Sequence, residues 1–359
     1  MAVGSTAMST IGRRKADHLT LCATGDVGFH ETTTLFEEVR LVHDALPELD
    51  ARDVDPACDL LGKRLRAPIV IAAMTGGTDA AARVNRELAA IAEARGYGFG
   101  LGSQRAMAVD PALAESYRVR DVAPTALVLG NVGVVQARAM STDAARALVE
   151  AVGADALCVH LNPAMEIVQP GGDRDFSGGL DAIARLARDL GVPIVAKETG
   201  CGISPKVARR LMGVGVRHVD VSGAGGTSWV GVEAKRAEVA GDARGRALGE
   251  AFWEWGIPTA ASVASLAPLG LELVATGGVK TGLDVAKAIA LGARAAGIAR
   301  PALVALEAGG RAGAEAFFDQ VEAELRAAML LTGSRTLADL GRAPRVLGGA
   351  LGLWLSALS

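Results

Sequence analysis

The sequence predicts a (β/α)8 TIM barrel with an N-terminal extension and a C-terminal helix and tail. Eight short apolar runs alternate with longer stretches, rich in Ala, Leu and Arg, whose apolar residues recur at helical spacing. Polar or glycine-rich motifs follow these runs directly. A length of 359 residues suits one large α/β domain or two smaller ones. A doubly wound parallel sheet is the alternative, but it accounts less well for eight evenly distributed runs.

Each predicted strand is short and rich in Val, Ile, Leu or Ala. The eight are PIVIAAM from Pro68, GFGLG from Gly98, ALVLGN from Ala126, ALCVHL from Ala156, PIVAKE from Pro193, HVDVSG from His218, LELVATGG from Leu271 and AAGIAR from Ala295. Helical stretches such as AARVNRELAAIAEARG lie between them, and several end in Gly, a frequent helix C-cap. We therefore divide the chain into an N-terminal arm and extension (1–66), the barrel (67–332) and a C-terminal tail (333–359).

Composition argues against several classes of partner. The net charge of −3 shows no bias toward nucleic acid or an anionic membrane, and 4% aromatic residues is little for a base-stacking surface. The N-terminus has no apolar run behind its basic residues, and the tail VLGGALGLWLSAL is too short to span a bilayer. None of the four cysteines forms a CxxC pair, which favours a reducing, cytoplasmic location.

Glycine-rich loops after the last strands predict a phosphate site. Gly277 and Gly278 follow the seventh predicted strand, and ARPAL follows the eighth. These loops often bind phosphate in barrels through backbone N–H groups and a helix N-terminus. Ordinary tight turns would explain one Gly-Gly pair, but SGAGGTSW adds further N–H groups and the Thr227 hydroxyl. We expect a mononucleotide phosphate there.

Lys197 closes the fifth predicted strand and should point into the barrel mouth. A buried lysine needs a negative partner. A flavin ring is one candidate, because a lysine near N1 and O2 stabilises the anionic reduced form. A structural pair with Glu198 or another carboxylate is the alternative, and a Schiff-base role is also open.

Two basic clusters suggest a second phosphorylated ligand. The first lies on the N-terminal arm and the second follows the second predicted strand; their members are Arg14, Lys15, His18, Ser103, Gln104 and Arg105. A solvated basic patch is the plain interpretation of the first cluster. A clamp that orders over a diphosphate is the functional one.

The stretch HLNPAMEIVQPGGDRDF carries the densest set of hydrogen-bonding groups. His160 and Asn162 would share a face and orient an anion. Glu166 could hold Mg²⁺ that bridges diphosphate oxygens. We interpret Asp173 and Asp175 as caps of the following helix.

Taken in order, these motifs resemble those of the type II isopentenyl-diphosphate isomerases, which are FMN-dependent (β/α)8 barrels. The resemblance runs from about Arg14 to about Leu303. It rests on RKADH, MTGGT, GSQR, GNVG, HLNPAMEIVQPGGDRDF, KETGCGIS, DVSGAGGTSW, WGIPT, ATGGVKTGLDVAKAIALGA and ARPAL.

The resemblance implies a role for each site residue. FMN would be held by Met74, Thr75, Gly76, Ser103, Asn131, Lys197, Thr227, Gly277, Gly278, Ala299 and Arg300. Substrate would meet Arg14, Lys15, His18, Ser103, Gln104, Arg105, His160, Asn162 and Met165. Glu166 matches the Mg²⁺ ligand, and the residues implied in catalysis are His160, Asn162, Met165, Glu166 and Lys197.

The resemblance also implies a reaction. The family moves a double bond between isopentenyl and dimethylallyl diphosphate without net redox change. It needs reduced FMN, usually made with NAD(P)H, and we expect NADPH as the reductant; the reduced flavin acts as the acid–base group. A homo-oligomer, a tetramer or larger, is the implied assembly.

Met165 departs from the family pattern His-Leu-Asn-x-x-Gln-Glu. Met is similar in length to Gln, but it cannot donate a hydrogen bond and accepts one weakly. Three interpretations follow: isomerase activity persists through the flavin, the pocket accepts a modified prenyl diphosphate with more apolar bulk, or ligands bind with poor turnover. We expect retained isomerase-type chemistry.

Three other functions compete with this reading. An FMN-dependent α-hydroxy-acid oxidase or dehydrogenase needs a His base late in the barrel, which SGAGGTSW and TGGVKTG lack. A non-catalytic FMN- or phosphate-binding barrel predicts no proton exchange into prenyl diphosphates. A Schiff-base aldolase acting through Lys197 is the third.

Overall fold

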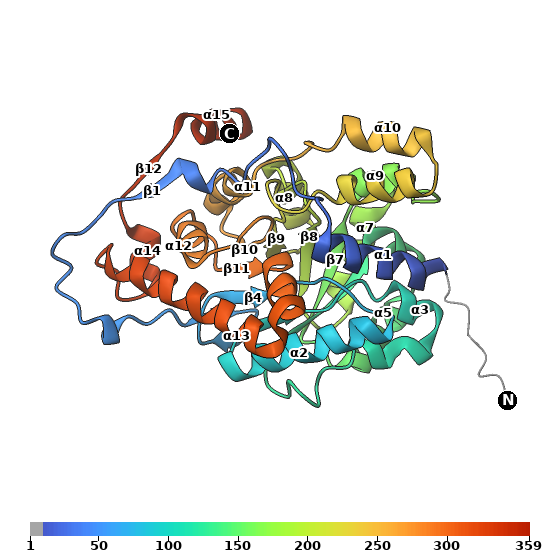
Figure 1. Ribbon diagram of the computed structural model, residues 1–359, viewed down its shortest axis with the longest axis horizontal. Helices are drawn as coiled ribbons and strands as arrows, with labels where there is room; N and C mark the ends of the chain where they lie inside the picture. The colour runs from blue at the N-terminus through green and yellow to red at the C-terminus, as the bar shows by residue number, and fades with distance from the viewer. Residues whose placement is uncertain (1–9) are drawn as a thin grey trace.

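Eight parallel strands close into a barrel in the computed structural model, which describes residues 10–359 (Figure 1). Around the barrel the strands run β10-β11-β4-β5-β6-β7-β8-β9. Their bounds are β4 (Ile69–Ile71), β5 (Gly98–Gly100), β6 (Leu127–Gly133), β7 (Ala156–Leu161), β8 (Ile194–Glu198), β9 (His218–Asp220), β10 (Glu272–Ala275) and β11 (Ala295–Ile298). Seven of them lie within one predicted apolar run each, and β6 begins within its run and extends two residues past it, to Gly133. The (β/α)8 expectation is therefore confirmed and the doubly wound alternative is wrong.

The strands bury both of their faces, as strands of a parallel sheet covered by helices do. One buried cluster fills the barrel interior and includes Val70, Leu129 and Val274. A larger cluster joins the outer faces to the surrounding helices. This burial explains why the strands appear in the sequence as continuous apolar runs and not as alternating ones.

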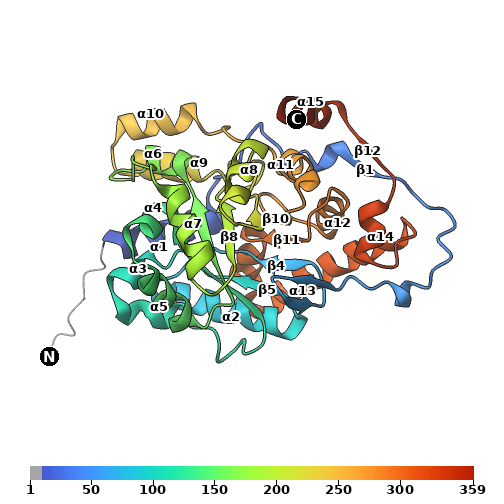
Figure 2. The same ribbon diagram turned by 180° about the vertical axis from the view of Figure 1, so that it is seen from behind.

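The helices that follow the strands surround the barrel (Figures 1 and 2). Their bounds are α2 (Asp79–Arg95), α3 (Arg105–Val109), α4 (Val134–Ala139), α5 (Thr142–Val152), α6 (Pro163–Val168), α7 (Gly179–Asp189), α8 (Pro205–Gly213), α9 (Trp229–Val239), α10 (Ala243–Ala251), α11 (Thr259–Leu266), α12 (Gly282–Ala290) and α13 (Arg300–Leu330). The caps follow the sequence: the Thr78 side chain accepts from the Ala81 N–H at the start of α2, and Gly96 ends α2 in the left-handed region.

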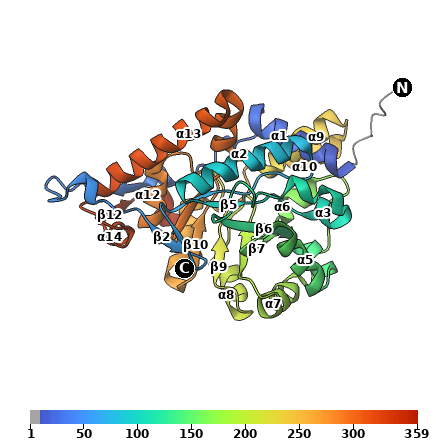
Figure 3. The ribbon, with the colours of Figure 1, turned by 90° about the horizontal axis from the view of Figure 1, so that it is seen from below.

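The N-terminal extension contributes to the barrel at both ends. The hairpin of β2 (Cys58–Leu60) and β3 (Lys63–Leu65) inserts Leu60 and Leu65 into the interior cluster. Helix α1 (Thr10–Thr24) packs against α13 and α9 (Figure 3). The extension is thus part of the packed structure.

The C-terminal tail folds back onto the extension. After α14 (Leu337–Arg342), strand β12 (Arg345–Leu347) pairs antiparallel with β1 (Val39–Leu41), and α15 (Gly349–Leu358) ends the chain. Figure 1 shows α15 above this two-stranded sheet. The N-terminal extension and the C-terminal tail, which lie at opposite ends of the sequence, are therefore joined in one small sheet. No helix within residues 10–359 combines the length and apolarity needed to cross a bilayer.

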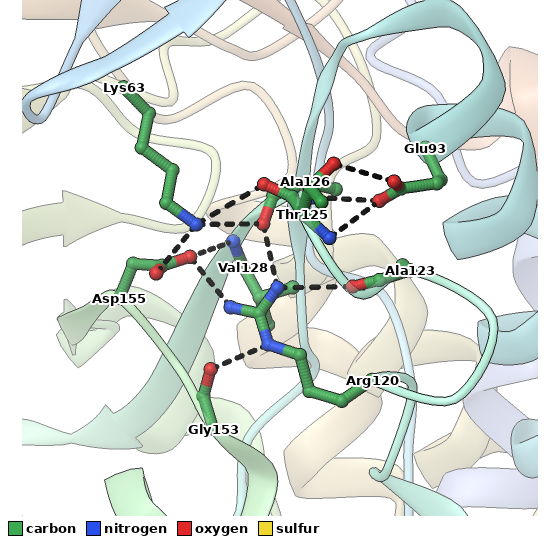
Figure 4. A network of polar contacts seen from close by, with 9 residues as sticks. All are labelled: Lys63, Glu93, Arg120, Ala123, Thr125, Ala126, Val128, Gly153 and Asp155. Atoms are coloured by element: carbon green, nitrogen blue, oxygen red, sulfur yellow. Dashed lines mark hydrogen bonds and ion pairs between the residues drawn. The ribbon is translucent and has the colours of Figure 1, made fainter.

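A polar network holds the amino-terminal edge of the barrel together (Figure 4). Asp155 accepts from the Val128 backbone N–H at 2.8 Å and pairs with Lys63 and Arg120, each at 2.7 Å. Arg120 also donates to the carbonyls of Gly153, at 2.8 Å, and of Ala123 and Ala126. The network joins the β2–β3 hairpin to β6 and β7 at the end opposite the βα loops.

Candidate active site

The carboxyl ends of the barrel strands surround a cavity of about 500 Å³. Barrel enzymes build their active sites at this end. All but two of the site residues predicted from the sequence line the cavity. These are Arg14, Lys15, His18, Met74, Thr75, Ser103, Arg105, Asn131, His160, Asn162, Met165, Glu166, Lys197, Thr227, Gly277, Gly278, Ala299 and Arg300.

The two exceptions are Gln104 and Gly76. The Gln104 side chain is fully buried: its Nε2 donates to the Leu148 carbonyl and its Oε1 accepts from the Asn131 N–H, both at 2.9 Å. Because both ends of this amide are used inside the fold, the predicted substrate contact for Gln104 is corrected to a role in holding β6. At Gly76, a Cβ atom would lie 2.0 Å from the Tyr117 ring, so the packing requires glycine there.

Lys197 has a carboxylate partner that the sequence analysis did not identify. Its Nζ lies 2.8 Å from Asp220 Oδ2 and 3.3 Å from the Thr276 hydroxyl, which itself donates to Asp220. Asp220 ends β9, the strand next to β8, and both charged side chains are nearly buried. Glu198 is not the partner: one of its oxygens accepts N–H groups of the following loop, including those of Thr199 and Gly200 at 2.6 Å.

Two glycine loops approach each other closely at the cavity wall. A Cβ atom on Gly226 would lie 2.3 Å from the Gly278 nitrogen, and Gly278 has a φ of +76°. Side chains are excluded at both positions, which leaves backbone N–H groups and the Thr227 hydroxyl beside the cavity. Such a cradle suits a phosphate.

The start of α13 completes this part of the cavity. Ala299 precedes the helix without a side-chain cap, so its first N–H groups have no side-chain partner at the cap position. The Arg300 guanidinium donates to the carbonyls of Cys22 at 2.9 Å and Gly25 at 2.6 Å. Arg300 therefore also ties the end of α1 to the barrel within one chain.

Positive side chains gather on the opposite wall. Lys15 donates to the Ser103 carbonyl at 2.8 Å and contacts the Tyr117 hydroxyl. Burial, together with the charge of Arg14, lowers the pKa of Lys15 to about 7. Burial and the charge of Arg105 also lower the pKa of Arg14. Binding of an anionic ligand would reduce the repulsion among these positive side chains.

His160 is neutral in this setting. Burial, followed by the charges of Lys197 and Arg105, lowers its pKa to about 4. Its Nδ1 lies 2.8 Å from Asn131 Oδ1, and Asn131 Nδ2 donates to the Leu101 carbonyl at 3.1 Å. This arrangement assigns the proton to Nδ1 and leaves Nε2 as an acceptor.

Glu166 is buried, at 6% exposure, beside the cavity. Its Oε1 accepts from Asn162 Nδ2 at 2.9 Å and its Oε2 from the Asp173 N–H at 2.7 Å. Within residues 10–359, no group of three or more His, Cys, Asp or Glu could hold a metal ion. Within this described part of the chain, the cavity therefore offers Mg²⁺ one carboxylate, that of Glu166. Such a site fits Mg²⁺ when phosphate oxygens of a ligand and water molecules supply the remaining ligands.

The aspartates after Glu166 do not cap a helix. Gly178, without a side-chain hydrogen bond, precedes α7. Asp173 lies 3.7 Å from Arg105, and Asp175 lies 2.9 Å from Arg138. The capping interpretation is therefore wrong, because the loop folds these carboxylates toward arginines of other elements.

Several residues of the site went unrecognised in the sequence: Asp220, Tyr117, Glu233, Trp229 and Gln169. Glu233 is fully buried and lies 2.6 Å from His18 Nε2, and the Trp229 ring meets His18 edge-on. Asp220 alone carried a usable signal, as a charge near the end of the apolar run HVDVSG. Tyr117, Glu233 and Trp229 meet the site residues only through tertiary contacts, and the side-chain oxygen of Gln169 has no hydrogen-bond partner among the described residues.

Comparison with known proteins gives a consistent result. The family model described as FMN-dependent dehydrogenase matches residues 7–167 and 164–346. The isopentenyl-diphosphate delta-isomerase of Methanosarcina barkeri is 47% identical over 95% of this chain and 93% of its own length. That of Halobacterium salinarum is 48% identical over 94% and 93%. A solved mandelate oxidase variant with a monooxide FMN adduct superposes with a TM-score of 0.63 at 21% identity, covering 91% of this chain and 95% of its own.

Proposed function

Because this chain belongs to the isopentenyl-diphosphate delta-isomerases within the FMN-dependent dehydrogenase family, we propose that it interconverts isopentenyl and dimethylallyl diphosphate using FMN and Mg²⁺. One observation carries the proposal. A single cavity joins a glycine phosphate cradle and a buried lysine on one side to a cationic cluster on the other. Two separate anion-binding features in one cavity indicate two phosphorylated ligands and not one.

The flavin side of the cavity fits FMN. Gly226, Gly278 and the start of α13 would hold its phosphate, and Lys197 would lie by the electron-rich edge of its ring. Bound and reduced, FMN would supply the group that gives a proton to the substrate and takes one back. Asp220 fixes the position of the Lys197 ammonium through their 2.8 Å contact.

The cationic side fits a diphosphate. Arg14, Lys15 and Arg105 would neutralise it, and its negative charge would favour the protonated form of His160, in which Nε2 is a donor. Glu166 would reach Mg²⁺ that the diphosphate oxygens also bind. Asn162 and the Asp173 N–H keep this carboxylate in place.

The cellular setting that we propose follows the family. NADPH would reduce the flavin, and the enzyme would act in the cytoplasm as a homo-oligomer, a tetramer or larger. The absence of disulfides among Cys22, Cys58, Cys158 and Cys201 supports a reducing location. The substrate partner is a small prenyl diphosphate, with no nucleic acid and no membrane insertion.

Met165 supports a second candidate, the same chemistry on a modified prenyl diphosphate. It lines the cavity between Asn162 and Glu166 in sequence and offers a thioether without a donor. Met165→Gln should raise activity on isopentenyl diphosphate if this residue tunes rate or substrate choice. Equal kcat/KM in the two proteins would exclude that role.

The test of the main proposal is product formation. The purified protein is incubated with FMN, NADPH, Mg²⁺ and isopentenyl diphosphate, and dimethylallyl diphosphate is measured. In parallel, lactate and mandelate are added to the oxidised holoenzyme. Dimethylallyl diphosphate without flavin bleaching by the acids supports the isomerase. Bleaching without isomerisation would assign an α-hydroxy-acid oxidoreductase.

A further inference from the structure

Gln169 has a side-chain carbonyl oxygen that the fold does not use. Among the side chains that the structure describes, its Oε1 is the one buried nitrogen or oxygen atom without a hydrogen-bond partner. Gln169 is 2% exposed and lines the cavity. Neighbouring polar groups are satisfied: Asn162 and Glu166 bond each other, and Asn131 bonds His160.

The backbone of Gln169 is well held, so the orphan amide is not a consequence of a loose segment. Its N–H donates to the Met165 carbonyl at 3.0 Å at the end of α6, and its carbonyl accepts from the Gly172 N–H at 2.9 Å. Met165 and Gln169 are thus four residues apart, and both reach the cavity. A buried carbonyl oxygen without a partner opposes folding, and such a group calls for a functional explanation.

The reaction proposed above supplies that explanation. A proton adds to the terminal methylene carbon of isopentenyl diphosphate, and the alkene electron pair forms the new C–H bond, which leaves a tertiary cation. Loss of a proton from the carbon next to the diphosphate-bearing carbon returns an electron pair as the new double bond. The alkene has no hydrogen-bond donor, so it satisfies no acceptor in the ground state. The cation attracts one.

We propose that the Gln169 carbonyl oxygen, beside the polarisable sulfur of Met165, stabilises the positive charge that develops on the substrate hydrocarbon. This inference rests on the proposed isomerase function. An acceptor without a ground-state partner is complementary to the transition state and not to the substrate, which is the condition for lowering the barrier. The positive side chains around the diphosphate repel a cation on the substrate hydrocarbon. An acceptor that offsets this repulsion therefore lowers the barrier more than it would in a neutral site.

The test compares two ligands on the reduced holoenzyme with Mg²⁺. One is isopentenyl diphosphate, and the other is 2-(dimethylamino)ethyl diphosphate, whose ammonium group imitates the cation. We expect Gln169→Leu to weaken binding of the ammonium compound about 10- to 100-fold, as hydrogen bonds to charged groups do. Binding of isopentenyl diphosphate should change less than about twofold, and kcat should fall while KM stays.

Two further variants complete the design. Gln136 is a second cavity-lining glutamine, whose Nε2 donates to Asp173 at 3.0 Å, and Gln136→Leu should leave the ratio of the two affinities unchanged. Gln169→Glu keeps the shape and adds negative charge, so it should raise the preference for the ammonium compound. The absorbance of bound FMN and the affinity for FMN show whether each variant folds. If Gln169→Leu does not fold, the comparison of Gln169→Glu with the wild type decides the question.

A ratio that is the same in wild type, Gln169→Leu and Gln169→Glu would overturn the inference, and a structural or water-bridged amide would give that result. Failure of the wild type to isomerise isopentenyl diphosphate would instead reject the proposed function. The two failures are therefore distinguishable.

Discussion

At the residue scale, charge pairing explains the site better than residue type does. Lys197 is predictable from the end of its strand, but its partner Asp220 is not, because the pairing depends on the register of β8 against β9. Gln104 shows the reverse: its motif suggests a ligand contact, and its amide is used to join β6 to the Leu148 carbonyl. Sequence locates the polar strand ends, and tertiary structure decides which of them face the cavity.

The two charges of the Lys197–Asp220 ion pair should have opposite effects on the reduction potential of the bound flavin, so removing one should raise it and removing the other should lower it. If FMN binds beside Lys197 as proposed, Asp220→Asn leaves a net positive charge near its ring, which stabilises the anionic reduced form and raises the reduction potential. Lys197→Gln leaves a net negative charge and lowers it. We expect shifts of about 30 mV or more, equivalent to about 1.4 kcal/mol for two electrons. Potentiometric titration of the bound flavin measures both, and shifts of the same sign would contradict the assignment.

Lys15 should make diphosphate binding dependent on pH. Its pKa of about 7 lies below the ordinary value of 10.5, so in the unliganded protein it loses its proton as pH rises through 7. A bound diphosphate favours the charged form, and binding above pH 7 should take up a proton and weaken with rising pH. Calorimetry in buffers of different ionisation enthalpy measures the uptake. Lys15→Arg keeps its charge, so uptake undiminished in that variant would assign the proton elsewhere.

At the element scale, the two ends of the barrel have separate tasks. The loops after the strands carry the cavity, while the Asp155 network clamps the ends of β6, β7 and the β2–β3 hairpin. Hydrogen bonds and the neighbouring cations hold the pKa of Asp155 below its ordinary value against the opposing effect of burial. The ordinary pKa of this carboxyl, taken for the unfolded chain, is 3.8. Because the folded-state pKa is lower, the carboxylate stabilises the fold at pH values above 3.8, and this contribution is lost as pH falls through the folded-state pKa.

Asp155→Asn should therefore destabilise the protein without altering its chemistry. The variant loses two ion pairs and weakens an acceptor at the edge of the core, for which we expect about 1–3 kcal/mol in the free energy of unfolding. Chemical denaturation at pH 7 measures it. Asp59→Asn is the matched control, since Asp59 and its partner Arg64 are exposed and such pairs contribute about 0–1 kcal/mol. Equal effects at both positions would argue against the clamp.

At the scale of the whole molecule, local patterns predicted the barrel and missed the long-range closures. All eight strands lie in apolar runs because burial on both faces requires such runs. The pairing of Val39 with Leu347 and the insertion of Leu60 into the barrel interior join segments far apart in sequence, and no periodicity reports them. The position of α1 over the cavity likewise depends on hydrogen bonds from Arg300 to Cys22 and Gly25.

The most direct test of the whole account is proton exchange. The protein is incubated with FMN, NADPH, Mg²⁺ and isopentenyl diphosphate in D2O, and both diphosphates are examined by NMR. The account predicts dimethylallyl diphosphate that carries deuterium, which would show that the site transfers protons with Met165 in place. Normally reduced flavin together with undeuterated isopentenyl diphosphate would contradict it.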